Sequence, residues 1–199
     1  MTLDRFYPIV PDADWVERLL AWGARLIQLR IKDCPEPALR TEIEQARDAC
    51  AAAGAQLVVN DHWQLALDAG CDFVHLGQED FVGADIAALR RAGMRIGIST
   101  HDHAELDRAL AKAPDYVALG PIYPTQLKQM PWAPQGLARI AEWKRLVGAR
   151  PLVAIGGLTV ARAELCLVAG ADCVAVVGDI VRHPDPSRQA DAWLAATRL

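Results

Sequence analysis

The sequence predicts a single-domain (β/α)8 barrel, or TIM barrel, over residues 1–199. Six short runs of branched apolar residues end abruptly in polar, charged or glycine residues, as strands buried on both faces of a parallel sheet do. An alanine-ended helix, a tight turn, an aspartate and a strand recur three times, at Asp72, Asp115 and Asp172. This repeat favours alternating helices and strands. An open doubly wound sheet would usually carry a Gly-x-Gly-x-x-Gly turn, which the sequence lacks.

Six of the eight predicted strands are these apolar runs, and the strands near residues 6–10 and 115–120 complete the set. In each of the three repeats, glycine or proline ends the helix and the strand begins within a few residues, as short αβ loops require. We expect strands near residues 6–10, 25–31, 56–60, 72–76, 94–99, 115–120, 151–155 and 172–177.

The predicted helices occupy the intervals between the strands. Apolar residues from Leu39 to Cys50 recur at the spacing of one helix face. Asp102, with Glu105 three residues later, is typical of a capped helix start, and Thr159 indicates another. We expect helices near residues 12–22, 36–53, 62–69, 84–91, 102–112, 137–147, 159–169 and 187–197.

Composition narrows the class of protein. The net charge is −4 with both signs well mixed, which predicts no nucleic-acid partner. No apolar run approaches the length of a membrane span, and the N-terminus does not resemble a signal peptide. The five cysteines include no Cys-x-x-Cys pair, so we expect reduced thiols that fill apolar space in a cytoplasmic protein. Nothing in the sequence indicates an oligomeric state.

Two carboxylates follow neighbouring predicted strands. Asp61 comes directly after Asn60, and Asp80 follows the next strand. Because parallel strands place their carboxyl ends at one mouth of a barrel, these oxygen ligands suit Mg2+ held jointly with substrate phosphates. The alternative is that Asp61 only caps the helix that begins at His62.

Two cations alternate with apolar residues at the end of the second strand. Arg30 and Lys32 therefore share one face with Gln28. A buried pair of cations is costly unless an anion meets it, so this pair predicts a polyphosphate site beside the carboxylates. A structural salt-bridge cluster is the alternative.

Glycines follow the last two strands, at Gly156-Gly157 and at Val177-Gly178. Barrels commonly bind a phosphate there on backbone N–H groups, although glycine can equally serve only as a turn residue.

The connection over residues 121–136 is long enough to be a substrate lid, and it contains Lys128 and Trp132, which we place near the ligand. His101 and His103 would need a third ligand to bind zinc, so we do not predict a zinc site.

Several of these segments, taken in order from about residue 6 to 180, closely resemble the thiamine phosphate synthase family. The matching segments are Gln28-Leu29-Arg30-Ile31-Lys32, Asn60-Asp61, His75-Leu76-Gly77-Gln78-Glu79-Asp80, Gly97-Ile98-Ser99-Thr100-His101, Gly120-Pro121-Ile122-Tyr123-Pro124-Thr125 with Lys128, and Ala154-Ile155-Gly156-Gly157.

The resemblance implies an Mg2+-dependent transferase that joins hydroxymethylpyrimidine diphosphate to a thiazole phosphate and releases pyrophosphate. It assigns Mg2+ to Asp61 and Asp80. The diphosphate and the pyrimidine would contact Gln28, Arg30, Lys32, Asn60, Ser99 and Lys128, of which Arg30, Lys32, Ser99 and Lys128 would be catalytic. The thiazole phosphate would contact Thr125, Gln126, Leu127, Gly157, Val177 and Gly178. No side-chain nucleophile is needed, which agrees with the absence of a Ser/His or Cys/His arrangement.

Two positions depart from the family pattern. Leu127 stands where the family usually has a threonine, and Gly178 and Asp179 stand where it usually has a serine. An aspartate there would repel a phosphate unless its side chain turned away.

Two other functions stay open. One is a thiazole tautomerase of the same fold, although Pro121 stands where its catalytic histidine would fall. The other is a barrel that only binds a phosphorylated ligand, for which a metal-binding pair would have little use.

Overall fold

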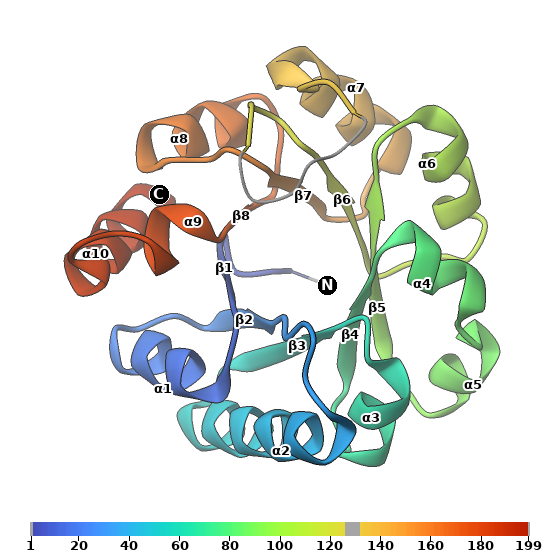
Figure 1. The fold of residues 1–199 in the computed structure, drawn as a ribbon. Coiled ribbons are helices and arrows are strands. Elements are labelled where there is room, and N and C mark those ends of the chain that lie inside the picture. The colour runs from blue at the N-terminus through green and yellow to red at the C-terminus, as the bar shows by residue number, and fades with distance from the viewer. Residues whose placement is uncertain (1, 126–131, 199) are drawn as a thin grey trace.

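Eight parallel strands close into a barrel in the computed structural model, which describes residues 2–125 and 132–198. Each strand pairs with its neighbour in chain order, and the last strand pairs with the first to complete the ring. Figure 1 shows the helices arranged around the outside of this ring. The predicted (β/α)8 barrel is therefore confirmed.

The strands begin and end within two residues of the predicted bounds. They are β1 (Phe6–Val10), β2 (Leu26–Leu29), β3 (Gln56–Asn60), β4 (Phe73–Leu76), β5 (Arg95–Thr100), β6 (Tyr116–Leu119), β7 (Leu152–Ile155) and β8 (Cys173–Val176).

The eight predicted helices are all present among the described residues. They are α1 (Ala13–Ala21), α2 (Glu36–Ala53), α3 (Trp63–Asp68), α5 (Ile86–Arg91), α6 (His103–Leu110), α7 (Gly136–Val147), α8 (Val160–Val168) and α10 (Pro186–Thr197). None of the helices in the two described stretches is both long enough and apolar enough to cross a membrane.

Two short helices were not predicted: α4 (Gln78–Gly83) and α9 (Gly178–Val181). Each is too short to show an apolar period, and each directly follows a strand end, β4 or β8. The predicted cap of α6 is confirmed, since the Asp102 side chain accepts a hydrogen bond from the Glu105 N–H at 2.8 Å. Thr159 precedes α8, but its side chain makes no capping hydrogen bond.

The core has two layers because side chains alternate along each strand. In β1, Phe6 and Val10 pack outward under the helices, whereas Tyr7 and Ile9 point into the barrel. Three of the cysteines, Cys50, Cys166 and Cys173, are buried.

The aspartates of the internal repeat join neighbouring strands at the amino ends of the barrel. Asp115 accepts a hydrogen bond from the Ile96 N–H of β5 at 2.8 Å, and Asp172 accepts one from the Leu152 N–H of β7 at 2.7 Å. A cation contacts each of the three: Arg95 contacts Asp72, Arg90 contacts Asp115, and Lys144 contacts Asp172. The repeat is therefore a structural device at the end opposite the carboxyl ends of the strands.

Candidate active site

The carboxylates of Asp61 and Asp80 converge above Gly77. The Gly77 N–H donates to Asp61 Oδ1 at 3.4 Å. A Cβ placed on Gly77 would lie 3.2 Å from Asp80 Oδ2 and 3.9 Å from Asp61 Oδ1. Burial, and then the negative charge of Asp80, raise the pKa of Asp61 above its usual range. Two acids thus share one small space at the mouth.

The pairing of β3 with β4 brings these acids together. Asn60 lies opposite His75 in the register, and the Asp61 N–H donates to the His75 carbonyl at 2.9 Å. Asp61 then turns with a φ of +62°, a left-handed conformation that few residues other than glycine adopt. Its carboxylate does not cap α3, because the residue in the cap position is His62. The capping alternative for Asp61 is therefore wrong.

A cleft of about 580 Å³ lies beside the two carboxylates. Lys32, Asp61, His62, Glu79 and Asp80 all contribute to its wall. This cleft therefore combines two of the predicted metal ligands with one of the predicted phosphate-binding cations.

The sequence predicted a buried pair of cations at Arg30 and Lys32, but neither residue is buried. β2 ends at Leu29, so Arg30 is half-buried at the mouth and Lys32 is exposed. Across residues 2–125 and 132–198, neither cation forms an ion pair with a carboxylate. This arrangement does not support the salt-bridge alternative and leaves both charges for an anionic ligand.

A chain of hydrogen bonds crosses the interior of the barrel below the mouth. Gln28 Nε2 donates to the Tyr7 hydroxyl at 2.8 Å, and the two tyrosine hydroxyls, of Tyr7 and Tyr116, lie 3.0 Å apart. The Tyr116 hydroxyl lies 2.7 Å from His75 Nδ1, and His75 Nε2 lies 2.8 Å from Ser99 Oγ. The chain thus connects two predicted substrate contacts, Gln28 and Ser99.

Burial sets the charge state of this chain. His75 is only 8 % exposed, and burial lowers its pKa to about 4, with further lowering by the positive charges of Arg30 and His101. Burial also raises the pKa of Tyr7 and of Tyr116 above the usual range. The imidazole and both phenols are therefore neutral near pH 7.

The glycines after β7 allow a close approach of two loops. Gly156 and Gly157 have φ values of +98° and +66°, and a Cβ on Gly157 would lie 2.9 Å from the Cβ of Tyr123. Arg162 of α8 donates to the Gly157 carbonyl at 2.6 Å and lies over the Tyr123 ring. Arg162 was not predicted from the sequence, because its position near the start of a helix was its only signal.

Asp179 turns away from the end of β8. Its Oδ2 accepts hydrogen bonds from Gln189 Nε2 at 2.6 Å and from Trp193 Nε1 at 2.8 Å, both on α10. The expected repulsion of a phosphate beside Val177 and Gly178 is therefore relieved by this pairing.

Two groups of candidate residues remain, namely the two histidines considered for zinc and the residues of the predicted lid. His101 contacts Glu105 and His103 contacts Glu142, so the two histidines serve different acids. Among the described residues, no group of three or more potential metal-ligating side chains occurs. Trp132 stacks on the His101 ring, with 5.5 Å between the ring centres. Gln126, Leu127 and Lys128 lie outside the described residues.

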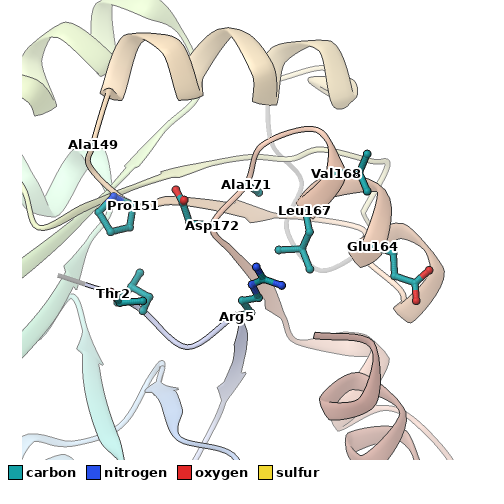
Figure 2. Close-up of a pocket in the computed structure, with 10 residues that line it drawn as sticks. Thr2, Arg5, Ala149, Pro151, Glu164, Leu167, Val168, Ala171 and Asp172 are labelled. Atoms are coloured by element: carbon teal, nitrogen blue, oxygen red, sulfur yellow. The ribbon is translucent and has the colours of Figure 1, made fainter. Parts of the chain in front are cut away.

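A second cavity, of about 630 Å³, lies at the opposite end of the barrel (Figure 2). Arg5, Pro151 and Asp172, which line it, each come just before a strand. In barrels of this kind, the amino ends of the strands serve stability and the carboxyl ends carry the active site.

A closed barrel whose acids and cations gather at the carboxyl ends of the strands, above a buried chain of polar side chains, has the architecture of TIM-barrel enzymes. The family model described as thiamine monophosphate synthase matches residues 6–180. The chain belongs to this family, and the resemblance seen in the sequence is confirmed.

Similar proteins support the assignment of the chain to this family. A thiamine-phosphate synthase of Rhizobium etli is 64% identical over 197 residues, which is 99% of this chain and 97% of that protein. The enzyme of the same name from Neisseria meningitidis serogroup A is 46% identical over 96% of this chain and 93% of its own length. The solved structure of a thiamine phosphate pyrophosphorylase from Pyrococcus furiosus superposes with a TM-score of 0.86 at 26% identity, covering 98% of this chain and 95% of that one.

Proposed function

We propose that this chain is a transferase that joins hydroxymethylpyrimidine diphosphate to a thiazole phosphate, forming thiamine phosphate and releasing pyrophosphate. The observation that carries this proposal is the cleft in which Asp61 and Asp80 lie beside Lys32. Within the described residues, Arg30 and Lys32 have no carboxylate partner. Paired acids next to such cations suit a diphosphate bound together with a divalent metal ion. Family membership supports the same reaction.

Asp61 and Asp80 would hold Mg2+. The fit rests on their convergence above Gly77 and on the raised pKa of Asp61, because a cation relieves the repulsion between two neighbouring acids. Two carboxylates suffice, since Mg2+ usually keeps several waters and takes its other ligands from substrate phosphates. When bound, Mg2+ would stabilise the negative charge of the departing pyrophosphate. Asn60 donates from its amide to Asp61 Oδ2 and so holds this carboxylate in place.

Arg30, Lys32 and Lys128 would bind the diphosphate. Cleavage of the bond between the pyrimidine methylene carbon and the diphosphate oxygen moves negative charge onto the leaving group. Fixed cations stabilise that charge without reorganising, which is a large contribution to catalysis. Arg30 is half-buried and Lys32 exposed at the mouth, where a diphosphate can reach both.

Gln28 and Ser99 would contact the pyrimidine. Gln28 is 1 % exposed, and its Oε1 is the buried side-chain oxygen without a hydrogen-bond partner in the described part of the chain. An acceptor in this position needs a donor, and the exocyclic amine of an aminopyrimidine supplies one.

Thr125, Gln126, Leu127, Gly157, Val177 and Gly178 would surround the thiazole phosphate. The close approach of Gly157 to Tyr123 supports this assignment for the β7 end, and the turned-away carboxylate of Asp179 supports it for the β8 end.

The test is release of pyrophosphate from purified protein. We expect release only when the pyrimidine diphosphate, the thiazole phosphate and Mg2+ are all present. Equal release without the thiazole would instead show a diphosphatase, and proton exchange on a thiazole without any release would show a tautomerase. Either result would overturn the proposal.

A further inference from the structure

The chain of hydrogen bonds inside the barrel has a direction. An amide nitrogen can only donate, so the Tyr7 oxygen accepts from Gln28 Nε2. The single proton of the Tyr7 hydroxyl then needs an acceptor, and its other partner is the Tyr116 oxygen. Were Tyr116 to donate to Tyr7 instead, the buried Tyr7 proton would be left without an acceptor, which is costly.

This direction continues to the histidine. Tyr116 receives the Tyr7 proton, so its own proton goes to His75 Nδ1, which lies 2.7 Å away. A buried imidazole whose partners are hydroxyls rather than carboxylates is neutral and carries one proton. With Nδ1 accepting, that proton is on Nε2, from which it is donated to Ser99 Oγ at 2.8 Å.

We propose that Tyr116 is a positioning residue, which holds His75 as the Nε2–H tautomer and thereby directs the Ser99 hydroxyl proton into the mouth toward a ring nitrogen of the pyrimidine. Ser99 is half-buried at the end of β5, so its hydroxyl has the barrel interior on one side and the mouth on the other. Since His75 occupies the Ser99 oxygen as a donor, Ser99 offers its own proton to a ligand acceptor.

The two ends of the chain of hydrogen bonds then present an acceptor and a donor to the ligand. Gln28 offers an acceptor, Oε1, because its amide nitrogen is used by Tyr7. Ser99 offers a donor. An aminopyrimidine carries the complementary pair, an amine that donates and a ring nitrogen that accepts. The identity of this ligand rests on the proposed function, whereas the tautomer does not.

Tyr116→Phe and Tyr7→Phe form a matched pair, since each removes one buried hydroxyl from the same chain. The readout is the 15N chemical shift of the two His75 nitrogens in the ligand-free protein, with the signals assigned by their loss in His75→Gln. We expect an unprotonated Nδ1 and a protonated Nε2 in the wild type and in Tyr7→Phe. In Tyr116→Phe, Nδ1 loses its donor, and we expect a mixture of tautomers.

Kinetics give a second readout. We expect Tyr116→Phe to lower kcat/KM for the pyrimidine diphosphate about fivefold, the effect of one neutral hydrogen bond, and to leave KM for the thiazole phosphate unchanged. A merely structural role would change both substrates alike and would affect Tyr7→Phe equally.

A protonated Nδ1 in the wild type, or an unchanged tautomer in Tyr116→Phe, would overturn the proposal. The 15N measurement needs no substrate, so it decides this question even if the assay of pyrophosphate release fails.

Discussion

The ring of Tyr116 occupies the space that a side chain at Gly97 would fill. The two residues lie opposite each other in the pairing of β5 with β6, and a Cβ on Gly97 would overlap the ring at Cζ. A glycine inside a strand often marks such a close approach. Here it makes room for the phenol that connects Tyr7 to His75.

Gly97→Ala is therefore expected to destabilise the protein by about 1–3 kcal/mol, the usual cost of overpacking a core. Urea unfolding measures this change. Gly83→Ala is the control, because a Cβ at Gly83 meets no atom within 4 Å. Equal stability of the two variants would contradict the tight fit.

Asp61→Asn and Asp80→Asn are expected to abolish turnover without lowering the melting temperature. Each loses a proposed Mg2+ ligand, and Asp61→Asn also removes the repulsion between the two carboxylates, which adds to burial in raising the pKa of Asp61. Activity is measured over a range of Mg2+ concentrations. Glu79→Gln is the control, since Glu79 lines the same cleft and is no proposed ligand. Full activity with an unchanged Mg2+ dependence in either aspartate variant would disprove the metal assignment.

Arg30→Ala, Lys32→Ala and Lys128→Ala should each slow the reaction by about a hundredfold or more, as loss of one preorganised charge does. Melting temperatures should hardly change for Arg30→Ala and Lys32→Ala, because these two cations form no ion pair within the described residues. Lys112→Ala, at an exposed lysine, provides the comparison. A lower melting temperature with normal activity would indicate a structural role instead.

Asp179→Ala should cost about 1–3 kcal/mol of stability, because it leaves the buried Trp193 Nε1 without its acceptor. KM for the thiazole phosphate should stay the same, since the carboxylate faces α10. Asp191→Ala, at an exposed position of the same helix, should be nearly neutral. A much lower KM in Asp179→Ala would mean that this charge acts on the phosphate.

His75 should make stability depend on pH. Its pKa is about 4 in the folded protein against an ordinary 6.5, so the unfolded chain binds the proton first. The contribution is complete above pH 6.5 and declines as the pH falls toward 4, by about 3 kcal/mol in all. Urea unfolding between pH 7.5 and about 5 measures the slope. The slope should be smaller in His75→Gln than in the wild type. An equal slope in the two proteins would contradict a buried neutral His75.

The fold could be predicted from the sequence because each strand of the barrel is a separate apolar run with a clear end. The helices α4 and α9 could not be predicted, because each is shorter than two full turns and therefore shows no helical period of apolar residues. Their formation depends on the strands that end beside them.

The acids of the site were predictable for the same reason, since Asp61 and Asp80 follow strand ends that a barrel must bring together. The buried chain of hydrogen bonds could not be predicted. Tyr7, His75 and Tyr116 come from β1, β4 and β6, and only closure of the barrel places them in contact. Gly97, a glycine inside an apolar run, was the one local sign of it.

The aspartates at the amino ends of the strands have a consequence for the opposite end. Asp115 and Asp172 connect the starts of β6 and β8 to the preceding strands, β5 and β7, by accepting hydrogen bonds from backbone N–H groups. At the other end, Asp61 combines a left-handed backbone with a repelling neighbour. The residues that hold the strands together at the amino ends are therefore different from those that form the candidate site. Exchange of side chains at the mouth can alter the chemistry of this barrel, while the hydrogen bonds at the amino ends of the strands preserve its shape.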